Sequence, residues 1–211
     1  MKTVVIADGD IEYAAKLIAE GKLVAVPTET VYGLSADGLC ESAVEEIYEV
    51  KGRPETKPIS LLVSDMDTAE QFCEDIPKEA YILAEKFWPG PLTMILRKKS
   101  VVPDIVTAGG DTVGVRCPDH PLTLELLKKC GKPLATPSAN ISGMPSPKSA
   151  DNVLSYFDGK IPCVIDGGKC SVGIESTIVD MTSATPKILR QGGLSRADIE
   201  NALGMEVIPC S

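Results

Sequence analysis

Segments with helical spacing and segments with strand-like apolar runs alternate along the whole chain of 211 residues. Between residues 11 and 18, apolar side chains recur every third or fourth position, which predicts an amphipathic helix ended by Gly21. The run LVAVP at residues 23–27 then predicts a buried strand. No repeat, low-complexity tract or linker interrupts the alternation. The sequence therefore predicts one α/β domain, residues 1–211, with a mixed sheet and flanking helices.

The same patterns place the remaining elements. Helices are expected at residues 42–50, 78–87, within 120–133, and at 151–157 and 195–203, the last capped by Ser195. Strands are expected at residues 60–63, 92–96, 112–116, 133–136, 163–166, 176–181 and 187–189. The single histidine, His120, is predicted to lie at the surface or to cap the helix that follows it.

Composition excludes several classes of protein. Hydrophobic residues make up 44% of the chain and aromatic residues only 4%, so the core must be aliphatic. A formal net charge of −9 argues against nucleic-acid binding through a general basic surface, although it allows a local basic pocket. The seven cysteines form no C-x-x-C pair, which favours reduced thiols in a cytoplasmic protein over disulfides or a zinc site. No run reaches the ~20 apolar residues of a membrane span.

The stretch KGRPETKP carries three cations, Lys51, Arg53 and Lys57, within seven residues. Its glycine and two prolines rule out a regular helix. The plainer interpretation is a solvated basic loop at a helix end. Cations gathered on a stiff loop are also suited to gripping phosphate, with arginine offering a planar fork and lysine a point charge. We therefore expect an anion clamp here.

Polar residues also stand where other strands begin or end. Thr28 and Thr30 follow the strand in AVPTETVYG, where a local turn is the alternative to a binding role. In DTVGVRCP, Thr112 and Arg116 share one strand face. A buried arginine needs a partner, which is either a ligand or a buried Asp or Glu.

Further hydroxyl, amide and cationic residues follow later in the chain: Thr136, Ser138, Asn140, Ser142 and Ser146 in TPSANISGMPSP, Ser176 in VGIESTIVD, and Arg190 in ILRQGG. An ordinary Ser/Pro loop is the alternative for the first group. Taken together, these residues predict a cleft rich in donors and cations but poor in catalytic acids and bases. Such a cleft is suited to phosphoryl or nucleotidyl transfer, where positioning and charge neutralisation dominate.

Seven stretches in this order, PTETVYGL, KGRPETKP, FWPGPLT, VGVRCPDHP, PSANISG, STIVD and ILRQGG, resemble the YrdC-like family, the L-threonylcarbamoyladenylate synthases. The resemblance extends from about residue 14 to residue 211. It implies a twisted mixed sheet of the YrdC-like, RibB-like type with a deep basic cleft. It also implies a cytoplasmic nucleotidyltransferase that makes threonylcarbamoyl-AMP and pyrophosphate from L-threonine, bicarbonate or CO2, and ATP. The product would serve t6A37 modification of tRNAs that read ANN codons, through downstream transferase proteins.

The resemblance also implies roles for individual residues. Lys51 and Arg53 would be catalytic, and Asn140 would shape its loop. ATP would be bound by Arg53, Lys57, Thr112, Ser138, Ser146 and Arg190. Threonine would be bound by Thr30, Leu62, Arg116, Thr136 and Ser176. Mg²⁺ would arrive with ATP, with no metal ligand from protein side chains.

One residue departs from the family pattern, because some relatives have histidine where this chain has Leu62. Any contact from this position must therefore come from backbone or apolar surface. Two other functions stay open at the level of sequence. One is an RNA-binding module that uses the same basic cleft, and the other is a related carbamoyl-transfer enzyme that acts on a different acceptor.

Overall fold

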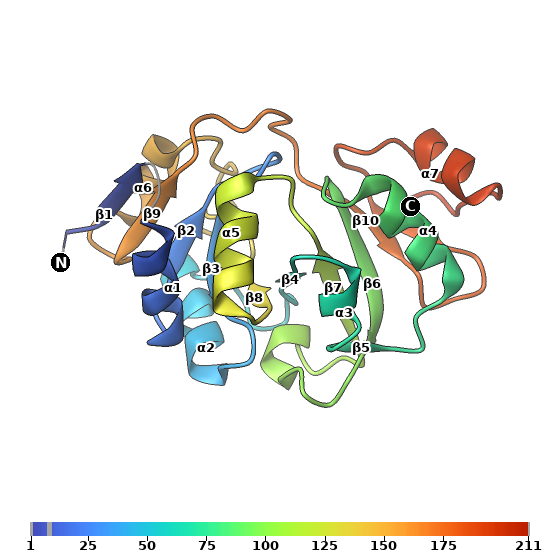
Figure 1. The fold of residues 1–211 in the computed structure, drawn as a ribbon, viewed down its shortest axis with the longest axis horizontal. Coiled ribbons are helices and arrows are strands. Elements are labelled where there is room, and N and C mark those ends of the chain that lie inside the picture. Colours follow the sequence, from blue (N-terminus) through green and yellow to red (C-terminus); the bar gives the residue numbers. More distant parts are fainter. Residues whose placement is uncertain (1, 8–9, 211) are drawn as a thin grey trace.

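The computed structural model describes residues 2–7 and 10–210, so the predicted domain, residues 1–211, has only residues 1, 8–9 and 211 outside the described part. A mixed sheet of eleven strands runs through it, in the order β1-β9-β2-β3-β8-β4-β7-β6-β10-β11, with β5 paired to β6 (Figure 1). The strands are β1 Val4–Ala7, β2 Val24–Val26, β3 Gly33–Asp37, β4 Leu61–Leu62, β5 Cys73–Glu74, β6 Leu92–Lys98, β7 Thr112–Arg116, β8 Leu134–Ala135, β9 Cys163–Asp166, β10 Thr177–Asp180 and β11 Lys187–Arg190.

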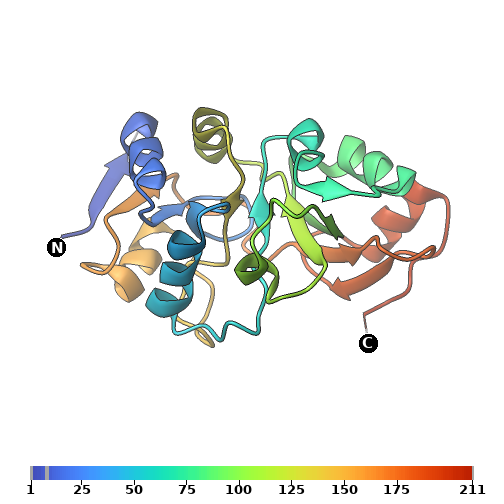
Figure 2. The ribbon, with the colours of Figure 1, turned by 90° about the horizontal axis from the view of Figure 1, so that it is seen from below.

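Helices cover both faces of this sheet. They are α1 Ile11–Ala19, α2 Glu41–Lys51, α3 Met66–Ala69, α4 Lys78–Phe87, α5 Pro121–Cys130, α6 Ala150–Phe157 and α7 Arg196–Leu203, with a 3₁₀ turn, η1, at Asp104–Thr107. Figure 2 shows α1, α3, α4 and α5 on one side of the sheet and α2 and α6 on the other. The sheet contains parallel pairs, such as β4 with β7, and antiparallel pairs, such as β2 with β3, which confirms the predicted mixed α/β fold.

The helix ends follow the local chemistry that the sequence indicates. Ser195 accepts a hydrogen bond from the backbone N–H of Asp198, as predicted for a cap. Gly52 and Gly131 stand just past the ends of α2 and α5 with φ of 58° and 60°, a conformation that suits glycine. His120 occupies the N-cap position of α5, as predicted, and its carbonyl oxygen accepts the N–H of Leu124, but its side chain makes no capping hydrogen bond and the residue is partly buried.

The predicted helices and strands are all present, but the sequence patterns missed β1, β3, β5, α3 and η1. The most consequential omission is β3, whose sequence GLSAD holds no β-branched residue. All five of its residues are buried because it pairs with β2 on one side and β8 on the other. Tertiary pairing, not local propensity, makes this segment a strand.

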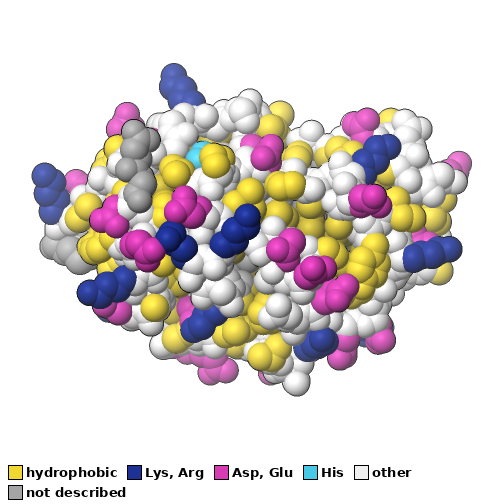
Figure 3. Space-filling view, in the orientation of Figure 1, with side chains coloured by type: hydrophobic (Ala, Val, Ile, Leu, Met, Phe, Trp, Pro, Cys, Tyr) yellow, Lys and Arg dark blue, Asp and Glu magenta, His cyan; other side chains and the backbone are white. Residues whose placement is uncertain are grey.

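Aliphatic side chains fill the core, as the composition predicted. One cluster of buried residues joins α1 and α5 to the sheet, including Ile11, Ile18 and Leu126, and a larger one fills the rest of the domain. On the face seen in Figure 3, acidic and basic side chains are interspersed, with apolar side chains between them. No helix in the described ranges is both long enough and apolar enough to cross a membrane.

Neighbouring residues of α4 allow a test of this core. Leu83 is completely buried, whereas the adjacent Ile82 is 40% exposed. We expect Leu83→Ala to lower the free energy of unfolding by about 2–5 kcal/mol, because it removes packed methyl groups and leaves a cavity. Ile82→Ala should change it by about 0.5 kcal/mol or less. Urea denaturation of both variants measures the difference, and equal losses would contradict this packing.

Candidate functional site

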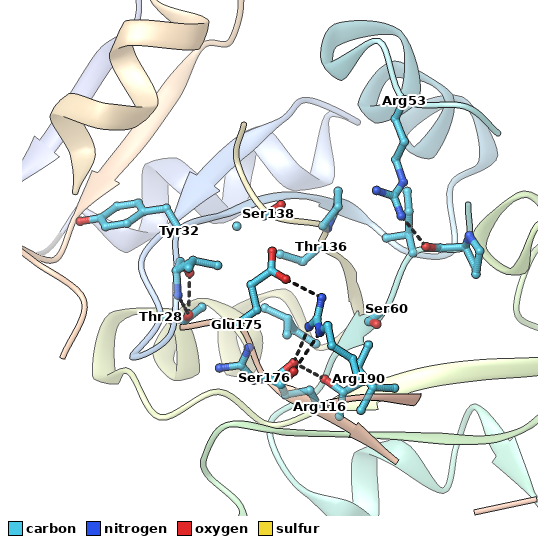
Figure 4. A pocket seen from close by; sticks show the side chains of 18 residues that line it. Thr28, Tyr32, Arg53, Ser60, Arg116, Thr136, Ser138, Glu175, Ser176 and Arg190 are labelled. Carbon is cyan, nitrogen blue, oxygen red and sulfur yellow. Dashed lines mark hydrogen bonds and ion pairs between the residues drawn. The ribbon is translucent and has the colours of Figure 1, made fainter. Parts of the chain in front are cut away.

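A cavity of about 220 Å³ opens where several strands end (Figure 4). Its walls come from segments far apart in the chain: residues 28–33 after β2, residues 53–62 between α2 and β4, the ends of β6, β7 and β11, residues 136–138 after β8, and residues 175–178. Gly33 is required at one wall, because an added Cβ atom would lie 2.3 Å from Cγ2 of Thr136. This tight approach lets β3 and the loop after β8 share the cavity edge.

The cavity gathers eight of the residues singled out in the sequence: Thr28, Arg53, Leu62, Arg116, Thr136, Ser138, Ser176 and Arg190. The hydroxyl of the buried Thr30 lies 2.8 Å from that of Thr28, but Thr30 does not itself line the cavity. Thr112 stands at the opposite end of β7 from Arg116 and is not part of the lining.

The three cations of KGRPETKP separate. Arg53 lines the cavity, and its guanidinium donates to the carbonyl oxygens of Lys57 (3.2 Å) and Pro58 (2.8 Å). Lys57 is exposed and its side chain is not among the lining groups. The loop therefore presents one cation to the cavity wall, not three.

Lys51 is buried, with a relative exposure of 1%. Its Nζ donates to the backbone carbonyl oxygens of Ser138 and Asn140, so Lys51 holds the backbone of the loop after β8 in place. Burial, and then the nearby Arg53 charge, lower the pKa of Lys51 to about 7. The Asn140 amide donates to the carbonyl oxygens of Ile141 and Met144, which shapes the same loop locally.

Arg116 has the acidic partner that the sequence left unidentified. Its Nη2 lies 2.7 Å from Oε1 of Glu29, with only 9% and 6% of the two side chains exposed. Its Nε donates to the carbonyl oxygen of Gly90, and Oε2 of Glu29 accepts the backbone N–H of Asp119. Arg116 still lines the cavity, so the pair orients its guanidinium without removing it from the wall.

Glu175 is a lining residue that the sequence patterns did not single out. Its Oε2 lies 2.7 Å from Nη1 of Arg190, and its Oε1 accepts a hydrogen bond of 2.9 Å from the hydroxyl of Ser146. Arg190 also donates to the carbonyl oxygen and the hydroxyl of Ser176. No periodicity marks Glu175 in the sequence; its only signal is its position next to Ser176, at the start of a strand.

The lining therefore carries three guanidinium groups, Arg53, Arg116 and Arg190, and one carboxylate, Glu175. Hydroxyl groups of Thr28, Ser60, Thr93, Thr136, Ser138 and Ser176 stand among them. The deep basic character expected of the cleft stays a prediction. In the described ranges no three His, Cys, Asp or Glu side chains come together as a metal site.

The chain is similar to known proteins in both sequence and fold. The family model Sua5_yciO_yrdC, described as "Telomere recombination", matches residues 16–192. The chain is 50% identical to a threonylcarbamoyl-AMP synthase of Pyrococcus abyssi and 44% identical to that of Bacillus subtilis, over 94% and 93% of its length. It spans only 58% and 57% of those two relatives.

A solved structure, P. abyssi Sua5 complexed with L-threonine, superposes with a TM-score of 0.94 at 47% identity. The match covers 99% of this chain and 62% of that one. The fold expected from the sequence resemblance is therefore shared with the P. abyssi protein, whose crystal structure contains L-threonine.

The buried ion pair yields a stability prediction. We expect Glu29→Gln to lower the free energy of unfolding by about 3–5 kcal/mol, because it leaves the Arg116 charge buried and uncompensated. Glu20→Gln breaks an ion pair with Lys16 whose side chains are 51% and 73% exposed. That control should cost less than about 1 kcal/mol. Chemical denaturation compares the two, and a loss at Glu29 as small as at Glu20 would refute the role of the pair.

Lys51 yields a pH prediction. Between its folded pKa of about 7 and the ordinary value of 10.5, the unfolded chain holds a proton that the folded chain lacks. Stability should therefore rise with pH across this window. We expect the unfolding free energy of the wild type, relative to Lys51→Met, to increase from pH 7 to pH 10. Lys57→Met, which removes an exposed lysine nearby, should follow the wild type; a pH-independent gap at Lys51 would count against the assignment.

Proposed function

The chain belongs to the Sua5/YciO/YrdC family, and from that premise we propose that it is a threonylcarbamoyl-AMP synthase. It joins L-threonine, bicarbonate or CO2, and ATP into threonylcarbamoyl-AMP and releases pyrophosphate. The observation that carries the proposal is the convergence of Arg53, Arg116 and Arg190 on one cavity with a ring of hydroxyl groups. Support for threonine as substrate comes from the P. abyssi structure with that amino acid.

Two regions of the cavity suit the two substrates. Arg116 is held firmly by Glu29 near Leu62, Thr136 and Ser176, and it binds the threonine carboxylate, with Thr30 acting through Thr28. Leu62 contributes apolar surface to this region. The ATP phosphates lie towards Arg53, Ser138 and Arg190, with Ser146 at the margin.

Two of the expected ATP contacts lie away from the lining. Lys57 is exposed and reaches a phosphate only by turning inward, and Thr112 reaches the nucleotide only if the nucleotide extends along β7. Lys51 serves catalysis by holding the backbone of Ser138 and Asn140, not by touching phosphate from its buried position.

The reaction follows from this arrangement. The threonine amine captures CO2 as a carbamate, and a carbamate oxygen attacks the α-phosphorus of ATP in line while pyrophosphate leaves. Negative charge builds on the phosphates, and Arg53, Arg190 and the Mg²⁺ that accompanies ATP neutralise it. Mg²⁺ enters as part of the substrate.

We place this activity in the cytoplasm, upstream of the transferase proteins that install t6A37 on tRNAs reading ANN codons. The protein would meet tRNA only indirectly. Direct RNA binding is the less favoured function, because single-stranded RNA binding relies on aromatic stacking, and Tyr32 is the one aromatic residue in the described cavity lining. A carbamoyl-transfer enzyme with another acceptor would use carbamoyl phosphate in place of threonine.

One assay separates these functions. Purified protein is supplied with ATP, Mg²⁺ and bicarbonate, either alone, with threonine, or with carbamoyl phosphate, and pyrophosphate release is measured. Release that requires threonine supports the synthase, whereas release that requires carbamoyl phosphate supports the other transferase. A protein that releases none, but binds RNA with an affinity that falls steeply with salt, would replace the proposal by RNA binding.

Arg53 provides the kinetic prediction. Arg53→Ala should raise the barrier by about 2–4 kcal/mol, a fall of roughly 30-fold to 1,000-fold in kcat/KM, because a phosphate-neutralising guanidinium is lost. Glu55→Ala, which removes an exposed carboxylate from the same loop, is the matched control and should stay close to wild type. Steady-state kinetics with ATP varied would settle the matter, and near-wild-type turnover of Arg53→Ala would defeat the assignment.

A further inference from the structure

Glu175 joins three segments at the cavity mouth. It is the last residue but one of the segment 167–176 that connects β9 to β10, and its carboxylate contacts Arg190 at the end of β11 and Ser146 in the loop after β8. Figure 4 shows this side chain directed into the cavity, towards Arg190. Both carboxylate oxygens are engaged, one by a guanidinium and one by a hydroxyl group.

The groups that hold Glu175 are donors of the kind that bind phosphate. A guanidinium offers paired N–H groups to an anion, and a serine hydroxyl adds a third donor. A carboxylate placed between them presents two anionic oxygens, as a phosphate group would. The donors of Arg190 and Ser146 thus form a site that suits an anionic group, and the carboxylate of Glu175 fills that site.

The two ion pairs of the cavity differ in how readily they can be exchanged. In the Glu29–Arg116 pair, 6% and 9% of the side chains are exposed, so separating the charges would leave both without solvent. In the Glu175–Arg190 pair, 38% and 41% are exposed, so water can solvate either group, and another anion can replace the carboxylate at little cost. The backbone of Glu175 is held separately, since its carbonyl oxygen accepts the N–H of Gly193.

We propose that Glu175 is a built-in counter-anion that occupies the Arg190 and Ser146 donors until a phosphate group of the substrate displaces it. The identification of that phosphate with ATP rests on the proposed function. The displacement needs only a side-chain rotation, because the backbone contact to Gly193 can stay in place. An incoming anion must therefore carry enough negative charge to compete with the Glu175 carboxylate for the donors of Arg190 and Ser146.

A binding experiment tests this without relying on catalysis. Inorganic tripolyphosphate is titrated into the protein by calorimetry, without Mg²⁺, at low and at moderate salt. Glu175→Gln should bind it more tightly by about fivefold, because the competing charge is gone while an amide side chain remains. Glu20→Gln removes one negative charge from an exposed ion pair elsewhere and should change binding by less than about twofold.

A second pair of variants tests whether Arg190 is the donor for which Glu175 and the phosphate compete. In Arg190→Gln, tripolyphosphate binding should weaken, and adding Glu175→Gln to it should no longer produce the gain. Unchanged or weaker binding by Glu175→Gln alone would overturn the inference, as would a complete lack of tripolyphosphate binding by every variant. Tighter binding in a protein without threonine-dependent pyrophosphate release would uphold the inference and refute only the proposed reaction.

Discussion

The buried pair of Glu29 and Arg116 connects more of the molecule than any other described side-chain contact of the site. Through it the turn after β2 meets the end of β7, and the second carboxylate oxygen reaches the entry to α5 at Asp119. Arg116 also holds the carbonyl oxygen of Gly90 before β6, and the N–H of Val172 donates to the backbone oxygen of Glu29. Since neither charge tolerates burial alone, these segments have to come together as one unit.

The guanidinium groups of Arg53, Arg116 and Arg190 thus differ in burial and in the partners that hold them. Arg116 is locked by a buried carboxylate, Arg53 is held by two carbonyl oxygens of its own loop, and Arg190 is paired with a half-exposed carboxylate. The first can orient a substrate carboxylate without moving. The N–H groups of Arg53 and Arg190 can exchange their present partners for a more highly charged anion. The division of labour between threonine and nucleotide that we propose follows from these differences in burial.

Local patterns in the sequence predicted most of the fold, because helix periodicity, glycine stops and apolar runs act over a few residues. They failed at β3, whose GLSAD segment becomes a strand only through its two neighbours in the sheet. The site was predicted in part: Arg53, Arg116 and Arg190 do share a cavity, but Lys57 does not join them. Charge content alone could not distinguish Lys51, buried beneath a loop, from Lys57 in solvent, because burial depends on contacts made 87 residues away.

The partners of the cations were harder to foresee. The need for an acid near Arg116 was evident, but Glu29 lies 87 residues earlier in the chain, and Glu175 gave no signal beyond its neighbour Ser176. Pairings at such distances are set by sheet order and not by spacing.

The wide spread of the cavity walls also bears on how the protein is made. The first wall is supplied near residue 28 and the last at Arg190, on β11, which pairs with β10 in the sheet. While the chain is being synthesised, the cavity lacks the wall that Arg190 supplies until β11 has left the ribosome. A nascent chain can therefore bury much of its aliphatic interior before the cavity is complete, so a ligand of this cavity cannot guide folding until Arg190 has been synthesised.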